Sequence, residues 1–131
     1  MGYRSEVILA VDAKIVPALM VAFAKCEETQ KLCTQHVDNL ETDYDGKGNW
    51  LMRWDHIKWY DSYPEVAMIE KLVEGMESDD LEEFGLKDLT LSAGDGYGEL
   101  FKFVRVGEEM DDNEVRGYGF DNIYISRSIS V

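Results

Sequence analysis

Cysteine is scarce in this sequence, since only Cys26 and Cys33 occur among 131 residues. They lie seven residues apart in a stretch with helical periodicity. Two turns of helix separate such residues by roughly 10 Å, which exceeds the Cα reach of a disulfide. Two unbridged thiols are typical of a reducing compartment. We expect both to be small apolar core side chains. A metal site is the weaker alternative, because no histidine lies at ligand spacing.

Long hydrophobic runs are also missing. The first apolar run, residues 7–11, ends after five residues at Asp12. It is too short for the core of a signal peptide and far too short to cross a bilayer. Together with the unbridged thiols, this predicts a cytoplasmic protein.

Basic residues are few, with 13 Lys and Arg against 27 Asp and Glu, and the net charge is −14. Such a balance argues against direct binding to nucleic acid or to an anionic membrane surface. The acids are concentrated in residues 61–114, where 17 acids and 4 bases give −13. This stretch is therefore either a solubilising surface or a surface that binds something basic.

Motifs of the common enzyme classes are absent. There is no Walker A loop, nucleophile elbow, zinc-protease helix motif or paired CxxC. The glycines of residues 94–98 do not precede a helix, so a hairpin turn explains them better than a phosphate-binding loop. Residues 43–49 superficially resemble a calcium loop, but the bidentate carboxylate position falls on Met52 or Trp54. We predict no cofactor and no metal.

Neither histidine has the surroundings of a general base. His36 ends the first predicted helix, where the helix dipole favours a cation. His56 lies in a predicted strand, and its neighbour Asp55 points to the opposite face, so it does not orient the imidazole. The sequence therefore predicts a protein that is not an enzyme.

The chain does contain enough apolar material for one core, with 45% hydrophobic residues, 3 Trp, 7 Tyr and 5 Phe. Its length is typical of one domain, so we predict a single α+β domain over residues 1–131. The order β-α-β-α-β-β-β indicates a mixed, mostly antiparallel sheet with two helices on one face. The predicted elements are strand 7–11, helix 13–34, strand 50–60, helix 62–77, a hairpin of 89–91 and 100–106, a loop over 107–121 and strand 123–131.

The strand predicted over residues 50–60 is rich in aromatic side chains. Alternation places Trp50 and Trp54 on one face and Trp59 on the other. Core packing is the default interpretation. If the helices cover the Trp59 face, Trp50 and Trp54 are partly exposed and form an interface with a partner or with a second copy. The protein is then a monomer or a homodimer.

Several blocks of the sequence resemble one group of proteins. These blocks are GYRSEV at residues 2–7, WYDSYPEV at 59–66, FVRVGE at 103–108 followed by Asp111, Asp112 and Glu114, and ISRSI at 125–129. In them the chain resembles small uncharacterised acidic proteins encoded by bacteriophages and prophages. The resemblance implies a phage-linked origin and a host-cell cytoplasm. It implies no activity, ligand or site residue.

The acidic balance favours a non-enzymatic accessory protein that binds a basic protein surface. Rows of carboxylates imitate the field of phosphates, so the partner could be a host defence or nucleic-acid enzyme inhibited by a nucleic-acid mimic. One continuous acidic face would favour this function, whereas acids around a pocket beside His56 would favour an enzyme. The alternatives are a small-ligand or catalytic domain that uses the glycine-rich loops and carboxylates, and an oligomeric structural protein. The predicted partner-binding residues are Asp79, Asp80, Glu82, Glu83, Glu108, Glu109, Asp111, Asp112 and Glu114.

Overall fold

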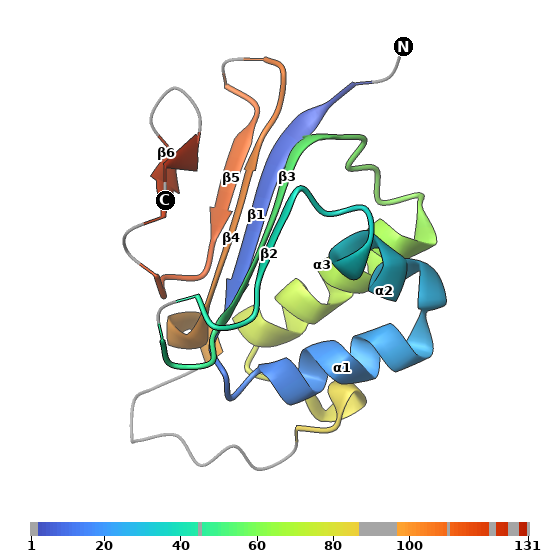
Figure 1. Ribbon diagram of the computed structural model, residues 1–131, viewed down its shortest axis with the longest axis vertical. Coiled ribbons are helices and arrows are strands. Elements are labelled where there is room, and N and C mark those ends of the chain that lie inside the picture. The colour runs from blue at the N-terminus through green and yellow to red at the C-terminus, as the bar shows by residue number, and fades with distance from the viewer. Residues whose placement is uncertain are drawn as a thin grey trace.

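An antiparallel sheet organises the protein. The computed structural model describes residues 3–44, 46–86, 97–109, 111–120, 123–125 and 129–130. In this part of the chain, five strands form one sheet in the order β2-β3-β1-β4-β5 (Figure 1). The predicted α+β class is confirmed, and the described strand pairs of the sheet are all antiparallel. In sheet order, the strands are Asn39–Glu41, Trp50–Ile57, Ser5–Val11, Phe101–Val106 and Asn113–Arg116.

Strand β1 lies at the centre of the sheet and is covered on both faces. Its side chains alternate across the sheet. Val7, Leu9 and Val11 enter the core on the helix side, and Ile8 and Ala10 enter a second cluster on the opposite face. All five have no exposed surface. The uninterrupted apolar run in the sequence therefore reflects burial on two faces.

Three α-helices lie on the same side of the sheet, namely α1 (Val16–Lys25), α2 (Glu27–Thr34) and α3 (Pro64–Glu77) (Figure 1). The single helix predicted over residues 13–34 is wrong, because Cys26 has an extended backbone (φ −144°, ψ 106°) that separates α1 from α2. The second predicted helix agrees with α3. The described part of the chain thus has three α-helices where two were predicted.

The helices cover the face of β3 that carries Trp54, and the prediction of an exposed aromatic interface is wrong there. The Trp54 side chain is 1% exposed and its Nε1 donates a hydrogen bond to the carbonyl oxygen of Leu32 (3.1 Å). Trp50 is half-buried and packs against the same core. Because the helices cover this face, the pair cannot form the predicted aromatic interface.

Trp59 also reaches the helix-side core, although alternation predicts the opposite face for it. Ser5 pairs with Ile57 but Val7 pairs with Trp54, so β3 carries one extra residue in this interval. Such a bulge shifts the alternation of the bulged strand, and β3 ends at Ile57. The ring of Trp59 lies 5.5 Å from that of Trp54 and 5.8 Å from that of Phe103.

The C-terminal third of the chain departs most from prediction. Within the predicted loop over 107–121 lies β5, which pairs with β4. In place of one strand over 123–131 there are two short antiparallel strands, β6 (Tyr124–Ile125) and β7 (Ile129–Ser130). The predicted strand at 89–91 lies outside the described residues. Ile123 is buried in the second apolar cluster, so the segment before β6 helps to cover the face of the sheet opposite the helices.

The two thiols differ in their surroundings and are both free. Cys33 is buried as predicted, and burial raises the pKa of its thiol to about 12. Cys26, at the junction of α1 and α2, is only half-buried. None of the described helices is long and apolar enough to cross a bilayer.

Candidate functional site

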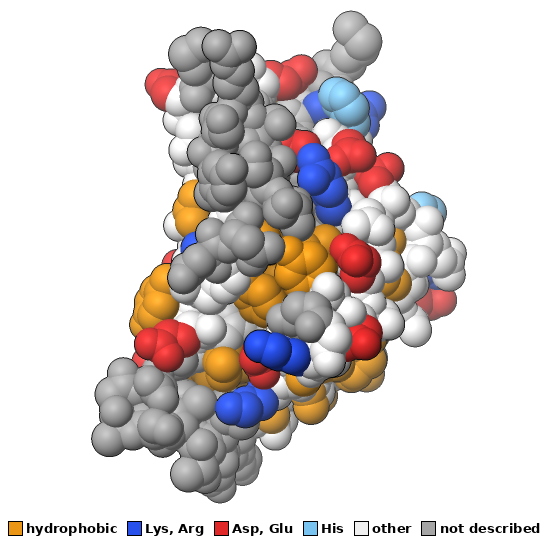
Figure 2. All heavy atoms as spheres, turned by 60° about the vertical axis from the view of Figure 1, so that its left-hand side comes forward, with side chains coloured by type: hydrophobic (Ala, Val, Ile, Leu, Met, Phe, Trp, Pro, Cys, Tyr) orange, Lys and Arg blue, Asp and Glu red, His pale blue; other side chains and the backbone are white. Residues whose placement is uncertain are grey.

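The acidic residues predicted to bind a partner lie in two groups at opposite ends of the molecule (Figure 1). Residues 79–83 follow α3 and lead into a 3₁₀ turn, η1 (Glu82–Phe84). Glu108, Glu109, Asp111 and Asp112 lie between β4 and β5, and Glu114 lies in β5, at the other end of the sheet. On the face drawn in Figure 2, acidic side chains are interspersed with basic and apolar ones. The two groups therefore do not form one continuous row of carboxylates.

In the first group, two carboxylates stabilise the chain after α3. Asp79 Oδ1 accepts a hydrogen bond from the backbone N–H of Tyr97 (2.8 Å), which begins the 3₁₀ turn η2 (Tyr97–Leu100). Asp80 Oδ1 accepts one from the backbone N–H of Glu82 (3.2 Å). These contacts give both side chains a structural role.

Glu83, also in the first group, is matched by two lysines. Its carboxylate lies 2.6 Å from the Lys71 ammonium on α3 and 3.7 Å from that of Lys25 on α1. The hydrogen bond from Lys71 lowers the pKa of Glu83. Glu83 therefore links two helices.

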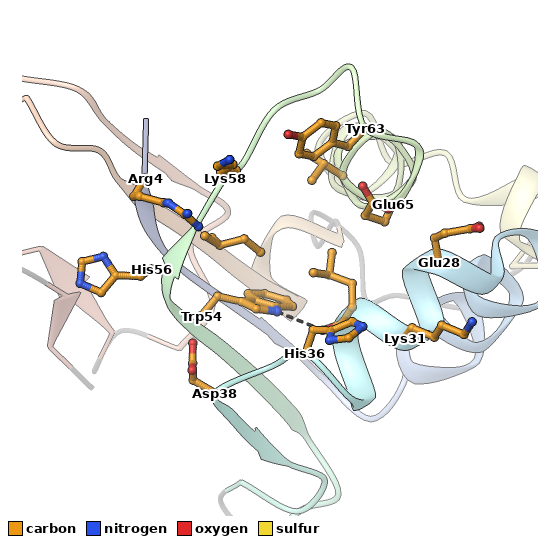
Figure 3. Close-up of a pocket in the computed structure, with 13 residues that line it drawn as sticks. Arg4, Glu28, Lys31, His36, Asp38, Trp54, His56, Lys58, Tyr63 and Glu65 are labelled. Atoms are coloured by element: carbon orange, nitrogen blue, oxygen red, sulfur yellow. Dashed lines mark hydrogen bonds between the residues drawn. The ribbon is translucent and has the colours of Figure 1, made fainter. Parts of the chain in front are cut away.

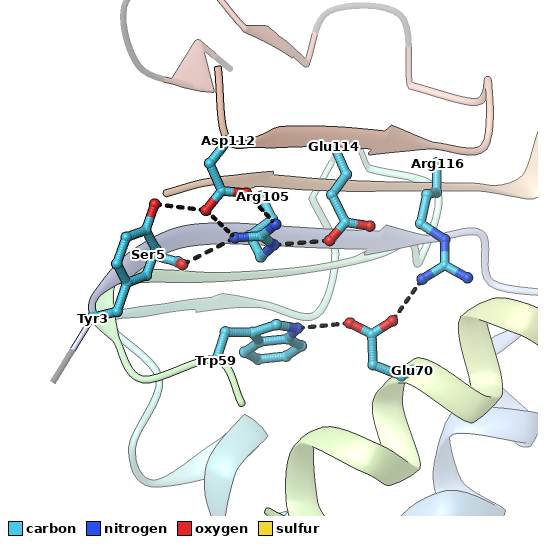
Figure 4. Close-up of polar contacts among 8 residues, drawn as sticks. All are labelled: Tyr3, Ser5, Trp59, Glu70, Arg105, Asp112, Glu114 and Arg116. Carbon is cyan, nitrogen blue, oxygen red and sulfur yellow. Dashed lines mark hydrogen bonds and ion pairs between the residues drawn. The ribbon is translucent and has the colours of Figure 1, made fainter. Parts of the chain in front are cut away.

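In the second group, Arg105 draws two of the acids together on the helix side of the sheet (Figure 4). Its guanidinium donates hydrogen bonds to Asp112 Oδ1 and Glu114 Oε1, each at 2.8 Å, and a longer one to Ser5 Oγ (3.4 Å). The hydroxyl of Tyr3 donates to Asp112 Oδ2 (2.6 Å). The hydrogen bonds from Arg105 and Tyr3 lower the pKa of Asp112 to about 2. The network ties the start of β1 to both β4 and β5.

The remaining acids of this group lie nearer the tip of the β4–β5 turn. Glu108 Oε2 accepts a hydrogen bond from the backbone N–H of Arg4 (3.1 Å). The backbone N–H of Glu109 donates to the Tyr3 hydroxyl oxygen (3.0 Å). Glu109 and Asp111 are exposed. The tip thus combines anchoring contacts with solvent-facing carboxylates.

A groove of about 920 Å³ runs between α3 and the β4–β5 side of the sheet. The sheet supplies one wall through Arg105 and its carboxylate partners, and α3 and the segment after β3 supply the other (Figure 4). The wall formed by α3 and that segment consists of Trp59, Tyr60, Asp61, Ser62, Ala67, Glu70, Lys71 and Glu74.

A second series of polar side-chain contacts joins α3 to β5 beside the groove (Figure 4). Glu70 accepts a hydrogen bond from Trp59 Nε1 (2.9 Å) and pairs with Arg116 (2.6 Å). Arg116 also pairs with Glu77, about two turns further along α3 (2.5 Å). Hydrogen bonding to Glu77 raises the pKa of Arg116. Arg116 and Arg105 are each matched by two carboxylates, so neither carries an excess of positive charge.

The groove lining is negative overall. It contains the five acids Asp61, Glu70, Glu74, Asp112 and Glu114 against two bases, Lys71 and Arg105. Lys71 is already held by Glu83. Asp61 and Glu74 make no ion pair with any residue that the structure describes. A cation entering the groove therefore meets two carboxylates that no base in the described part of the chain neutralises.

Sequence reasoning selected Asp112 and Glu114 but missed Arg105 and Glu70. Arg105 lies directly opposite Glu114 in the β4–β5 register, and opposite charges at paired strand positions stabilise a hairpin. The sequence did not reveal this pairing, because a loop was predicted where β5 lies. Nothing local marks Glu70, whose partner Arg116 is 46 residues away.

Both histidines line a second, smaller hollow of about 380 Å³ between β3, α2 and the start of α3. His36 lies beside Trp54 in Figure 3, whereas His56 points away from it on the other side of β3. The predicted acidic residues do not ring this pocket. Acidic residues around a pocket beside His56 would have favoured an enzyme, and the predicted acidic residues do not have this arrangement.

Comparisons of the chain with protein-family models, with curated proteins and with solved structures gave no match. Among the described residues, no three His, Cys, Asp or Glu side chains are grouped so that they could hold a metal ion. The groove and the smaller pocket are therefore the features of the described fold that bear on function.

The low pKa of Asp112 predicts a specific loss of stability in acid. A carboxyl whose pKa is lower in the folded than in the unfolded state stabilises the fold above its ordinary pKa of 3.8, and this stabilisation disappears as the pH falls toward about 2. Urea unfolding of the wild type and of Asp112→Asn, measured at several pH values, isolates this contribution. The difference between the two is expected to shrink between pH ~4 and ~2. A difference that stays constant would show that Asp112 is not held by Arg105 and Tyr3.

Proposed function

We propose that this protein is a non-enzymatic binding module that holds a basic segment of a partner protein in the groove between α3 and the β4–β5 strands. One observation supports the proposal above all. Five of the seven charged residues that line the groove are acidic, and Asp61 and Glu74 have no basic partner among the described residues. An arginine or lysine side chain of the partner would supply the missing positive charge.

The rigid surroundings of the groove favour binding. Arg105 and Arg116 fix four carboxylates in defined positions before any ligand arrives, so less side-chain ordering opposes association. Trp59 and Tyr60 add aromatic surface to the wall, and aromatic rings attract guanidinium and ammonium groups. The negative charge of the whole protein would also steer a basic partner toward it at low salt.

This proposal is narrower than a nucleic-acid mimic. A duplex-like surface needs carboxylates in a long continuous row, and the two predicted acidic groups lie at opposite ends of the molecule. A groove that encloses one cationic segment needs only a local excess of carboxylates. If the protein has the phage-linked origin that its sequence resemblance implies, its partner would be a protein of the host cell. That origin stays a prediction.

The test compares two double variants with the same net charge. Asp61→Lys with Glu74→Lys reverses the two unpaired acids of the groove. Glu41→Lys with Glu99→Lys reverses two exposed acids that do not line it. Binding of a fluorescent arginine-rich peptide is measured by anisotropy at two salt concentrations, with circular dichroism to verify folding.

The groove variant is expected to bind the peptide about tenfold more weakly than the wild type, which corresponds to about 1.4 kcal/mol. The control variant should lose much less affinity, because it changes the overall charge but not the groove. Equal losses in the two variants would contradict the proposal and show that the peptide responds to net charge alone. A pulldown from host lysate with the same two variants would then identify partners that depend on the groove.

A further inference from the structure

The smaller pocket, which both histidines line, is a second candidate binding site that is separate from the groove. It lies between β3, α2 and the start of α3, and its volume of about 380 Å³ falls in the range of small-molecule sites. Its apolar lining, called the floor here, includes Trp54, Leu32, Ile57 and Val66. Figure 3 shows Trp54 between β3 and α2. Trp54 is fixed there by its hydrogen bond to the Leu32 carbonyl. Trp54, Leu32 and Val66 are only 1%, 6% and 1% exposed, so the apolar surface that a ligand can reach belongs mainly to the half-buried Ile57 and the exposed Tyr63.

Basic residues are over-represented at this pocket in a strongly acidic protein. Arg4, Lys31 and Lys58 line it and are matched in number by Glu28, Asp38 and Glu65, whereas the whole chain has 13 bases against 27 acids. Lys31 has an exposed partner one helical turn away in Glu27 (3.5 Å). Arg4 and Lys58 make no ion pair with any described residue.

The unpaired state of Arg4 stands out against the other described arginines. Arg53, Arg105 and Arg116 each pair with two carboxylates. With 27 acids and 13 bases in the chain, an arginine without a carboxylate is the exception. Lys58 lines the same pocket as Arg4. The two cations thus form a site for an anionic group.

The pocket is also polarised. On the helix side two acids, Glu28 and Glu65, outnumber the single base Lys31, whereas Arg4 and Lys58 lie at the strand end (Figure 3). Asp38 is turned to the backbone of β3, where its Oδ2 accepts a hydrogen bond from the N–H of Asp55 (2.7 Å). A negative group is therefore repelled from the helices and attracted to the strand end, and an apolar body attached to it would lie over the floor.

We infer that this pocket binds a small organic carboxylate, with the carboxylate at Arg4 and Lys58 and an apolar body against Ile57 and Tyr63. An arginine fork and a lysine provide charge-assisted hydrogen bonds to such a group. Inorganic phosphate supplies the charge without the apolar body, and a neutral amide supplies the body without the charge. These two probes separate the contributions of the charge and the apolar body.

The experiment titrates 4-phenylbutyrate, 4-phenylbutanamide and inorganic phosphate into the isotopically labelled protein. Amide-proton and indole shifts of the pocket residues are followed by NMR. The carboxylate is expected to shift these signals with an affinity about fivefold or more above that of either other probe, as expected for one additional charge-assisted contact. Equal affinity of the amide, equal affinity of phosphate, or no shift with the carboxylate would each overturn the inference.

Variants of the pocket then test whether Arg4 and Lys58 bind the carboxylate group of the ligand. Arg4→Gln and Lys58→Gln should each weaken carboxylate binding about fivefold and leave amide binding unchanged. Lys14→Gln removes an exposed cation that does not line the pocket, so carboxylate binding should stay at the wild-type level. If Lys14→Gln lowers the affinity as much as the other two, the effect is one of net charge and the assignment of Arg4 and Lys58 is wrong. The spectra also report whether each variant is folded.

Discussion

Replacing Trp54 with alanine is expected to lower the free energy of unfolding by about 3 to 5 kcal/mol, the range measured for large aromatic residues truncated in a core. The side chain is 1% exposed and packs between the sheet and the helices. Its ring contacts that of Trp59, which in turn contacts Phe103. Removing it would leave a cavity that these rigid neighbours cannot fill.

Two further variants separate the contributions of Trp54. Trp54→Phe keeps an aromatic ring but removes the donor to the Leu32 carbonyl, so a smaller loss of about 1 to 3 kcal/mol is expected for the unsatisfied acceptor. Trp50→Ala truncates a tryptophan on the same strand that is only half-buried, and should be less damaging than Trp54→Ala. Urea unfolding followed by circular dichroism measures all three. If Trp50→Ala proved the more harmful, Trp54 would not be the anchor of the core.

The elements predicted correctly from the sequence are those whose own residues determine them. In α3, Pro64 occupies the first turn, where its missing N–H does no harm. Val66, Ile69 and Val73 recur at helical spacing and are all buried. The apolar run of β1 likewise indicated a buried strand. Local pattern and tertiary burial agree in these segments.

The elements predicted wrongly are determined by distant contacts. No proline or glycine marks Cys26, where α1 ends, and the break lets α2 pack against α3. Strand β5 has the sequence NEVR, which has little strand character of its own. It is held by pairing with β4 and by the opposite charges of Arg105 and Glu114. Alternation alone could not reveal the extra residue in β3 that redirects Trp59.

The sequence predicted only part of the candidate groove, because distant contacts also determine which of its acids are paired with a base. The excess of acids in residues 61–114 indicated a negative surface, but a carboxylate's role depends on whether a base neutralises it. Arg116 reaches Glu70 from 46 residues away, and Arg105 neutralises Asp112 and Glu114. Only the fold distinguishes these paired acids from Asp61 and Glu74.

Replacing Arg105 with methionine is expected to destabilise the fold by about 2 kcal/mol, since hydrogen bonds to charged groups contribute roughly 1.5 to 3 kcal/mol. The variant leaves Asp112 and Glu114 close together without their shared cation. Both carboxylates are about one-third exposed, at 34% and 35%, so water screens part of their repulsion and the loss should stay below that of a fully buried pair. Adding Asp112→Asn removes one of the two charges and should restore part of the lost stability. Urea unfolding at neutral pH measures both effects.

The same variant should strengthen peptide binding, because it removes one of the two bases from the groove lining. A change of one charge at close range in water corresponds to about 1 kcal/mol, or roughly fivefold in affinity for a cationic peptide at low salt. Lower stability together with tighter binding distinguishes a role in the groove from a purely structural one. A folded Arg105→Met protein that binds the peptide less well than the wild type would contradict this expectation, and would show that the order Arg105 imposes on Asp112 and Glu114 favours binding more than its charge opposes it. Raised salt should remove most of the gain in affinity but little of the loss in stability, since partly buried interactions are screened less than exposed ones.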